Sequence, residues 1–278
     1  RVERHGEHIM PAGIIEAGKI KNAKRLEEIL SSLRLQSGLR SVRVSLPEQQ
    51  VYLFRIRVGK SGLESVRESI ELVLEEHVPV PAAEAIFDYE LLGEDADNLD
   101  LQVAVISKNV IEGYLEVFKN AEIWVESFEL EAQAIARAVV KKGDLETYMI
   151  VDFGEKRTGI FIVSRGFVMF TSTLDFGGVM LNEMIMKNFK ISFEEAEKMK
   201  RKYGLLRNAE NRELFSVLLN SVSILRDETA KHFLYWHTHK DELEKNNPPI
   251  KKIILCGGDS NLIGLTDYFS VSMKTPVG

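Results

Sequence analysis

The sequence predicts an α/β protein in which short apolar strands alternate with amphipathic helices. Apolar runs of strand length, such as Tyr148–Phe153 and Lys252–Cys256, end at a glycine. Elsewhere apolar residues recur at the spacing of one helix face, as they do in 62–77. With 278 residues, the chain is long enough for two domains, or for one split domain with a substantial core.

Composition narrows the functional class. Apolar residues make up 45% of the chain and charged residues 28%, which is ordinary for a soluble globular protein. The net charge of −6 argues against general nucleic-acid binding, which needs a basic surface. The single cysteine, Cys256, excludes a disulfide framework and fits a reducing cytosol. No apolar run approaches the roughly 20 residues that span a bilayer, and the polar start does not resemble a signal peptide.

Local signals predict the elements of the first half of the chain. The segment Ile14–Ile20 is expected to form a short strand pair or turn. Asn22 can cap a helix that runs through Ser37 and ends at Gly38. Further elements are expected in this order: strands at 42–46 and 50–58, a helix at 62–77, strands at 87–91 and 101–106, a helix at 108–120 and a strand at 122–128.

An alanine-rich helix is expected next, opening at Glu129 and running to Val140. Small residues at nearly every turn allow another backbone to pack closely against it. The simplest interpretation is a buried connector helix, and this is compatible with Glu129 also pointing into a cleft.

The stretch from Tyr148 to Val163 predicts two core strands joined by a tight turn. Asp152 is unusual, because a carboxylate at the end of a buried strand needs a partner such as a metal, water or a cluster of donors. Gly154 lets the backbone approach a bulky anion, and Thr158 offers a hydroxyl. A plain β-hairpin with an acidic turn explains this stretch equally well.

Two further helices carry candidate ligand contacts. Gly177-Gly178 precedes a helix expected at 179–190, where glycine can expose backbone N–H groups to an anion. Ser192–Glu195 is a capping box for a helix that ends at Gly204, and a long helix is expected from about 211 to 239. The capped helix carries a charged run typical of a solvated face. Within this run, Glu197 and Lys200 are three residues apart and share one side of the helix.

The last motif is the strand Lys252–Cys256 followed by Gly257-Gly258 and a helix. A buried strand that runs into two glycines and a helix is suited to the approach of a phosphate or nucleoside. The spacing is not that of a Rossmann glycine motif, and the chain has no Walker motif and no zinc-ligand spacing.

Four of these segments together resemble the nucleotide-binding motifs of the actin-like ATPase superfamily, which includes actin, sugar kinases and FtsA. Their order and approximate separations agree with that pattern. The matching segments are Val151–Gly154 with Thr158 for the second phosphate loop, Glu129–Arg137 for the connecting helix, Glu197 with Lys200 for the Glu-x-x-Lys motif beside the adenosine, and Leu255–Gly264 for the adenosine motif.

The resemblance implies an α/β, ribonuclease H-like fold with two lobes that bind ATP and Mg²⁺ between them. It implies that Asp152 holds Mg²⁺ through water and that Glu129 positions the water for in-line attack. The residues implied to contact the nucleotide are Asp152, Gly154, Thr158, Gly177, Gly178, Glu197, Lys200, Gly257, Gly258 and Ser260.

A narrower resemblance, to the PilM family of type IV pilus assembly, covers nearly the whole chain. This family implies a cytoplasmic protein at the inner face of the inner membrane. It also implies binding to the N-terminal cytoplasmic peptide of PilN, with membrane contact only through that partner. Other pilus platform and motor proteins are implied as further partners. The resemblance does not decide whether the protein associates with itself. The segments that carry the resemblance are Pro11–Ile20, Ser45–Pro47, Val78–Pro81 with Asp88-Tyr89, Phe176–Gly178 and Ser192–Gly204.

The same resemblance implies a division into lobes and subdomains. The family pattern places a first phosphate loop before Arg1 and a last strand and helix after Gly278, so we expect the sequence to be truncated at both ends. The expected parts are an N-terminal lobe core at 1–47 and 124–145, an inserted α/β subdomain at 48–123, a C-terminal lobe core at 146–190 and 250–278, and a helical subdomain on the nucleotide side at 191–249.

One departure from the pattern bears on activity. Glu155, Lys156 and Arg157 stand where small residues are usual, and Glu155 would repel a phosphate. We therefore expect at most a slow ATPase, in which bound nucleotide sets the conformation rather than driving work. Two alternatives remain: a nucleotide-free scaffold resembling the cytoplasmic domain of the type II secretion protein GspL, and an FtsA-like polymer of cell division.

Overall fold

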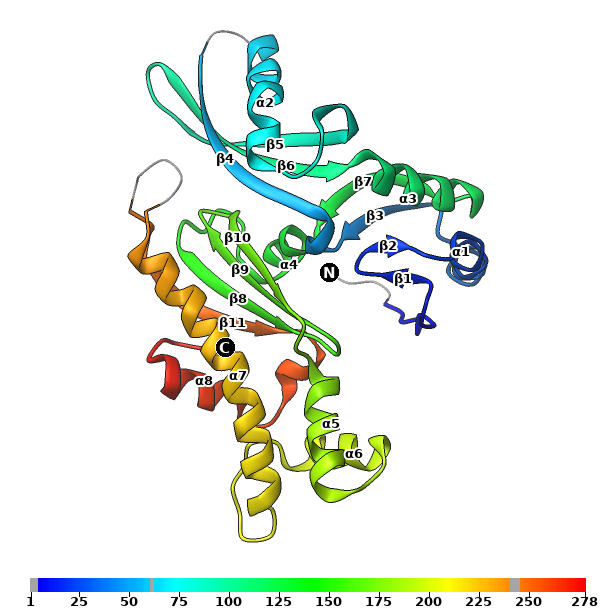
Figure 1. The fold of residues 1–278 in the computed structure, drawn as a ribbon, viewed down its shortest axis with the longest axis vertical. Helices are drawn as coiled ribbons and strands as arrows, with labels where there is room; N and C mark the ends of the chain where they lie inside the picture. Colours follow the sequence, from blue (N-terminus) through cyan, green and yellow to red (C-terminus); the bar gives the residue numbers. More distant parts are fainter. Residues whose placement is uncertain (1–4, 61–62, 241–245) are drawn as a thin grey trace. The chain divides into compact units, whose positions relative to one another are not determined.

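The computed structural model describes residues 5–60, 63–240 and 246–278. The first four residues and position 62 of the helix expected at 62–77 therefore lie outside the described part. The chain forms two compact units, Arg1–Glu131 and Ala132–Gly278, which are described separately below (Figure 1). The division falls inside the segment 124–145, which the sequence analysis assigned to one lobe.

The N-terminal unit begins with a small hairpin and a capped helix. Strands β1 (Ile15–Glu16) and β2 (Lys19–Ile20) pair antiparallel, as expected. Helix α1 (Ala23–Ser37) begins where the side chain of Asn22 accepts a hydrogen bond from the next turn, and it ends at Gly38, whose φ is 71°. Both ends of α1 therefore confirm the prediction from local signals.

Two small sheets complete this unit. Strands β3 and β7 pair in parallel, and β4, β6 and β5 form an antiparallel sheet in that order. Helix α2 packs on the antiparallel sheet over a core that includes Ile70, Leu101 and Val103, while α3 packs on α1 through Val117. The bounds are β3 Ser41–Leu46, β4 Val51–Gly59, α2 Leu63–His77, β5 Ala85–Glu94, β6 Asn98–Ser107, α3 Lys108–Asn120 and β7 Trp124–Leu130.

Strand β7 contains the first departure from the sequence analysis. Glu129 was expected to open a helix, but it lies in β7 opposite Ser45 of β3. Helix α4 begins two residues later and spans Glu131–Val139. Parallel pairing with β3 extends the strand through Leu130, and this non-local interaction outweighs the helical preference of the Glu-Leu-Glu-Ala sequence. The expectation that Glu129 opens the helix was therefore wrong.

The C-terminal unit is built around a four-stranded sheet in the order β10-β9-β8-β11. The neighbours β8, β9 and β10 are antiparallel, whereas β11 runs parallel to β8. The bounds of the strands are β8 Thr147–Phe153, β9 Thr158–Ser164, β10 Phe167–Leu174 and β11 Ile250–Cys256. The helices of this unit are α5 Gly178–Phe189, α6 Phe193–Tyr203, α7 Arg212–Thr238 and α8 Leu265–Met273.

One continuous apolar core holds the sheet of the C-terminal unit to its helices. Burial of each large apolar side chain in such a core contributes about 1.5–3 kcal/mol. None of the described helices is both long and apolar enough to cross a lipid bilayer. The core includes Met149, Val151, Phe153, Ile160, Ile162, Leu181, Leu218 and Phe269.

Candidate functional site

Asp152 and Gly257 meet at one edge of the four-stranded sheet. The parallel register places Cys256 of β11 opposite Asp152 of β8, so both strands end at the same edge. Gly257 has φ of 86°, and a Cβ at this position would lie 2.6 Å from Asp152 Oδ1 and 2.5 Å from the carbonyl oxygen of Phe153. Only glycine allows the turn after β11 to approach the carboxylate this closely.

The surroundings of Asp152 raise the pKa of its carboxyl above the ordinary value. Burial raises the pKa of Asp152, while a hydrogen bond from the Cys256 thiol and the charge of Arg157 oppose that rise. The thiol lies 3.8 Å from Asp152 Oδ1. Burial and the nearby Asp152 carboxylate together raise the pKa of Cys256 to about 12, so this thiol stays protonated and acts as a donor.

A single carboxylate in this position is compatible with Mg²⁺. Magnesium is commonly bound by one or two carboxylates together with ligand phosphates and water, rather than by a complete protein cage. The described residues contain no group of three or more His, Cys, Asp or Glu side chains that could hold a metal. The chemistry of the site therefore suits a metal delivered with a phosphate ligand and held by Asp152.

The loop after Asp152 is docked on the start of helix α5. The amide of Gly178 donates to the carbonyl of Gly154 at 3.0 Å, and the amide of Val179 donates to the carbonyl of Glu155 at 2.8 Å. A Cβ at Gly177 would lie 2.5 Å from the same Glu155 oxygen. The two glycines were expected to offer amide donors to an anion, but the Gly178 amide is used inside the protein. Gly177 lets the loop approach the start of the helix, because a side chain there would meet the loop backbone.

Two candidate hydroxyls are also engaged within the protein. Thr158 is fully buried, and its hydroxyl donates to the carbonyl of Phe176 at 2.7 Å. The hydroxyl of Ser260 donates to the carbonyl of Gly257 at 2.7 Å. In this structure the Thr158 hydroxyl supports the loop from inside, and its contact with phosphate stays a prediction.

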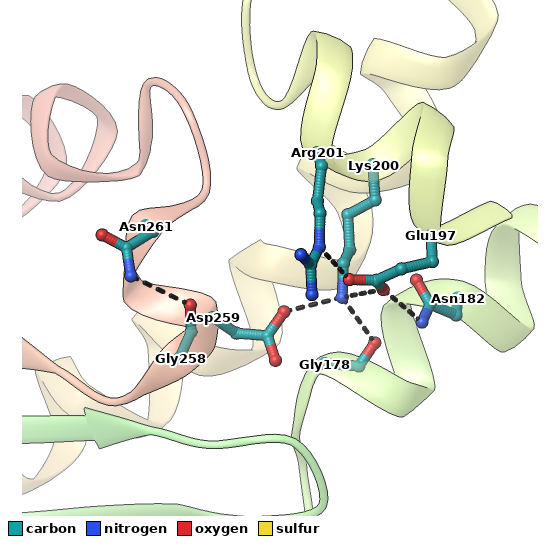
Figure 2. A network of polar contacts seen from close by, with 8 residues as sticks. All are labelled: Gly178, Asn182, Glu197, Lys200, Arg201, Gly258, Asp259 and Asn261. Carbon is teal, nitrogen blue, oxygen red and sulfur yellow. Dashed lines mark hydrogen bonds and ion pairs between the residues drawn. The ribbon is translucent and has the colours of Figure 1, made fainter. Parts of the chain in front are cut away.

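Glu197 and Lys200 lie in a network of polar contacts, as expected from their shared helix face (Figure 2). Lys200 is only 3% exposed, and its ammonium lies 2.8 Å from Glu197 Oε2 and 2.6 Å from Asp259 Oδ1. It also donates to the carbonyl of Gly178 at 3.4 Å. The lysine thus ties α6 to the start of α5 and to the 3₁₀ turn Gly258–Asn261.

The Glu197 carboxylate is held in its charged form. Burial alone would raise the pKa of Glu197, but hydrogen bonds from Lys200, Asn182 and Arg201 outweigh it and lower this pKa to about 2. Asn182 Nδ2 donates to Oε2 at 2.7 Å, and Arg201 Nε binds the other carboxylate oxygen. Both oxygens of Glu197 therefore already have cationic or amide donors.

Sequence analysis missed Asp259, which completes this network. A Cβ at Gly178 would fall on the Asp259 carboxylate, so glycine at 178 is what admits this side chain. Asp259 directly follows Gly257-Gly258, and this position next to the two glycines could have marked it as a candidate site residue. The turn also has an open face, because a Cβ at Gly258 would meet no protein atom within 4 Å.

All of the residues expected to contact nucleotide therefore belong to the C-terminal unit, whereas Glu129, expected to position water, does not. Asp152, Gly257 and Gly258 line one sheet edge, and the α6 network lies against the same turn through Asp259. Glu129 lies in strand β7 of the N-terminal unit.

A separate cavity of about 560 Å³ lies within the N-terminal unit. The β1–β2 hairpin, the start of β4, the segment Pro79–Pro81 and helix α3 all contribute to its wall. Its lining mixes apolar with uncharged polar side chains, and Lys19 and Glu84 add one charge of each sign. Side chains of the first two kinds include Ile20, Tyr52, Val80, Ser107, Asn109 and Val110.

Two side chains fix the hairpin that forms one wall of this cavity. Gln50 Nε2 donates to the carbonyl of Ala17 at 2.7 Å, and the Tyr114 hydroxyl donates to the carbonyl of Gly18 at 3.0 Å. Ala17 and Gly18 form the turn with φ of 46° and 75°. The turn is therefore held by groups that come from other elements, which makes this wall of the cavity preorganised.

Comparison with solved structures identifies the fold. The chain superposes on the protein in a "PilM-PilN type IV pilus biogenesis complex" with a TM-score of 0.78 and 19% identity, covering 97% of this chain and 78% of that one. It also superposes on MreB5 of Spiroplasma citri bound to ADP, with a TM-score of 0.55, and bound to AMPPNP, with a TM-score of 0.58. Each MreB5 comparison gives 17% identity and covers 99% of this chain and 75% of that one. The chain therefore has the predicted actin-like fold.

The comparison with protein-family models agrees with the narrower resemblance. The model described as "Type IV pilus assembly protein PilM" matches residues 1–277, which is nearly the whole sequence. The chain belongs to the PilM family of type IV pilus assembly proteins.

Proposed function

We propose that this protein is a cytoplasmic adaptor of the type IV pilus inner-membrane platform that binds the N-terminal cytoplasmic peptide of PilN. Family membership and the similarity to a protein solved in a PilM–PilN complex support this function. The observation that carries it furthest is the cavity in the N-terminal unit, which offers a preorganised site for a short peptide. Attachment to the membrane would then be made through the partner.

The lining of the cavity suits an extended peptide with few charges. Pro79 and Pro81 stiffen one wall, since proline fixes its own φ. Tyr52 is 38% exposed, so part of its ring is available to a ligand side chain. Ser107 and Asn109 offer side-chain donors and acceptors for a peptide backbone. Binding in a preformed site reduces the ordering cost that a flexible peptide otherwise carries.

Peptide binding is tested by fluorescence anisotropy with a labelled synthetic peptide of the N-terminal cytoplasmic segment of PilN from the same organism. We expect saturable binding that Tyr52→Ala weakens about tenfold, which is about 1.4 kcal/mol. Tyr235→Ala is a matched control, because Tyr235 is 51% exposed on α7 in the other unit. Saturable binding that both variants leave unchanged would move the peptide site elsewhere, and no binding at all would contradict the adaptor function.

We further propose that the C-terminal unit binds ATP with Mg²⁺. The similar MreB5 structures hold ADP and AMPPNP, which supports a nucleotide as the ligand. Asp152 would hold Mg²⁺ through water, and the open face at Gly258 would accept the nucleoside. Bound Mg²⁺ would neutralise phosphate charge beside Glu155. Because the Gly178 amide and the Thr158 hydroxyl are used inside the protein, we expect any hydrolysis to be slow and nucleotide to act mainly on conformation.

Calorimetric titration of MgATP tests this second proposal. We expect binding by the wild type, and at least tenfold weaker binding by Asp152→Ala. Asp144→Ala serves as control, because Asp144 precedes the same strand and lies outside the site. Failure of the wild type to bind at millimolar ATP would favour the nucleotide-free scaffold and would leave the peptide proposal intact.

A further inference from the structure

The three donors of the Lys200 ammonium all have acceptors inside the protein. A lysine ammonium has three N–H groups and no acceptor. Those of Lys200 face Asp259 Oδ1 at 2.6 Å, Glu197 Oε2 at 2.8 Å and the Gly178 carbonyl at 3.4 Å (Figure 2). With only 3% of the residue exposed, no donor remains for a ligand.

This ammonium lies close to the loop that follows Asp152. Gly178 links the two: its carbonyl accepts a hydrogen bond from Lys200, and its amide donates one to the carbonyl of Gly154. The Lys200 charge is therefore separated from the proposed phosphate loop by one glycine. A phosphate bound at that loop would be within the range of strong Coulomb attraction if the charge were not already compensated.

Asp259 is the residue whose negative charge compensates the charge of the Lys200 ammonium. Within the network, Glu197 binds two cations, Lys200 and Arg201, whereas Lys200 is the only cation bonded to Asp259 among the described residues. Two anions and two cations make the cluster neutral. Removal of the Asp259 charge would leave one net positive charge, that of the Lys200 ammonium, without a compensating anion.

We propose that Asp259 sets the phosphate selectivity of the nucleotide site by holding the Lys200 ammonium away from ligand phosphates. Asp259 is a positioning residue in this role, since it acts through Lys200. The wild-type site then gains little from phosphate beyond the contact through Mg²⁺, and the buried ion pair also fixes the turn Gly258–Asn261 against α6. This inference rests on the proposed binding of nucleotide by the C-terminal unit.

The test compares the affinities of MgATP and adenosine by calorimetry for the wild type and Asp259→Asn. We expect the ratio of ATP to adenosine affinity to rise about tenfold in the variant, because the uncompensated charge of Lys200 attracts phosphate but not an uncharged nucleoside. Adding Lys200→Met to Asp259→Asn should abolish the rise. Asp267→Asn, in the exposed first turn of α8, is the matched control and should leave the ratio unchanged.

A purely structural role predicts a different result. It would weaken ATP and adenosine by the same factor in Asp259→Asn, and this outcome would overturn the proposal while leaving the nucleotide site in place. Asp259→Ser removes the same charge with a smaller side chain and must give the same shift, which keeps the test decisive if the Asn variant does not fold. Failure of the folded wild type to bind either ligand would overturn the proposed nucleotide function, and this inference with it.

Discussion

The Asp259 carboxylate occupies the space beside Gly178 that any other residue would need for its Cβ. The same carboxylate places Oδ1 2.6 Å from Lys200 Nζ. The position of a buried lysine on α6 therefore depends on the absence of a side chain at the start of α5. Three segments that are distant in the sequence share one small volume at this point, and each constrains the other two.

This packing predicts that Gly178→Ala destabilises the protein by about 1–3 kcal/mol, as overpacking of a filled site usually does. The added methyl must displace Asp259 and leave the Lys200 ammonium with a poorer partner. Denaturant unfolding followed by circular dichroism measures the effect. Gly113→Ala is the control, because its Cβ would meet no atom within 4 Å and alanine favours a helix.

A double variant separates the clash from other effects of alanine. Combining Gly178→Ala with Asp259→Gly should recover part of the lost free energy of unfolding, since the space is then empty. Equal stability of Gly178→Ala and the wild type would show that Asp259 can move away without cost.

Signals that act within a few residues were sufficient to predict many of the elements. Asn22 and Gly38 fix the ends of α1, and the capping box of Ser192 and Glu195 fixes the start of α6. Each of these residues satisfies backbone groups one turn away. No tertiary information is needed for such a prediction, which is why these boundaries agree with the structure.

The features that the sequence did not reveal depend on partners that are distant along the chain. Glu129 lies in a strand because it pairs beside β3, which is about eighty residues earlier in the chain. The Thr158 hydroxyl donates to the carbonyl of Phe176. The Lys200 ammonium is paired with the carboxylate of Asp259, which is 59 residues away. The residue types at the candidate site could be read from the sequence, but the use of each donor and acceptor is decided by the fold.

The low pKa of Glu197 makes stability depend on pH. This carboxyl has its pKa lowered to about 2 in the folded protein, from 4.5, so its contribution is present above pH 4.5 and is lost as the pH falls through 2. We expect Glu197→Gln to cost about 1–2 kcal/mol at neutral pH, a value reduced for the partial exposure of the group. Unfolding by urea at a series of pH values measures it.

The difference between wild type and Glu197→Gln should shrink steadily below pH 4.5. Glu194→Gln is the matched control, because Glu194 lies exposed in the first turn of the same helix. A difference that stays constant between neutral pH and pH 2 would show that the glutamine acts through packing rather than through loss of charge.

The open face of Gly258 predicts a variant that keeps the fold and loses nucleotide. A methyl added there meets no protein atom within 4 Å, so Gly258→Ala should unfold at the same urea concentration as the wild type. The same methyl would occupy the surface where the proposed nucleoside lies, and we expect about tenfold weaker MgATP binding. Calorimetry gives the affinity, and binding of the PilN peptide should not change.

Gly166→Ala provides the contrast to this variant. Position 166 also has free space for a Cβ, but its φ of 86° strains alanine, so this change should cost stability without affecting nucleotide. Unaltered MgATP affinity in Gly258→Ala would exclude the turn after β11 as part of the nucleotide site.

The role implied for Glu129 can be separated from nucleotide binding. If its carboxylate positions the attacking water, Glu129→Ala should lower the rate of ATP hydrolysis about a hundredfold while changing MgATP affinity by less than about threefold. Release of phosphate at saturating MgATP measures the rate. Glu126→Ala is the control, since Glu126 lies in the same strand and its carboxylate accepts a hydrogen bond from Ser41. Equal hydrolysis by Glu129→Ala and the wild type would remove Glu129 from the mechanism, because alanine has no polar group that could order the reacting water.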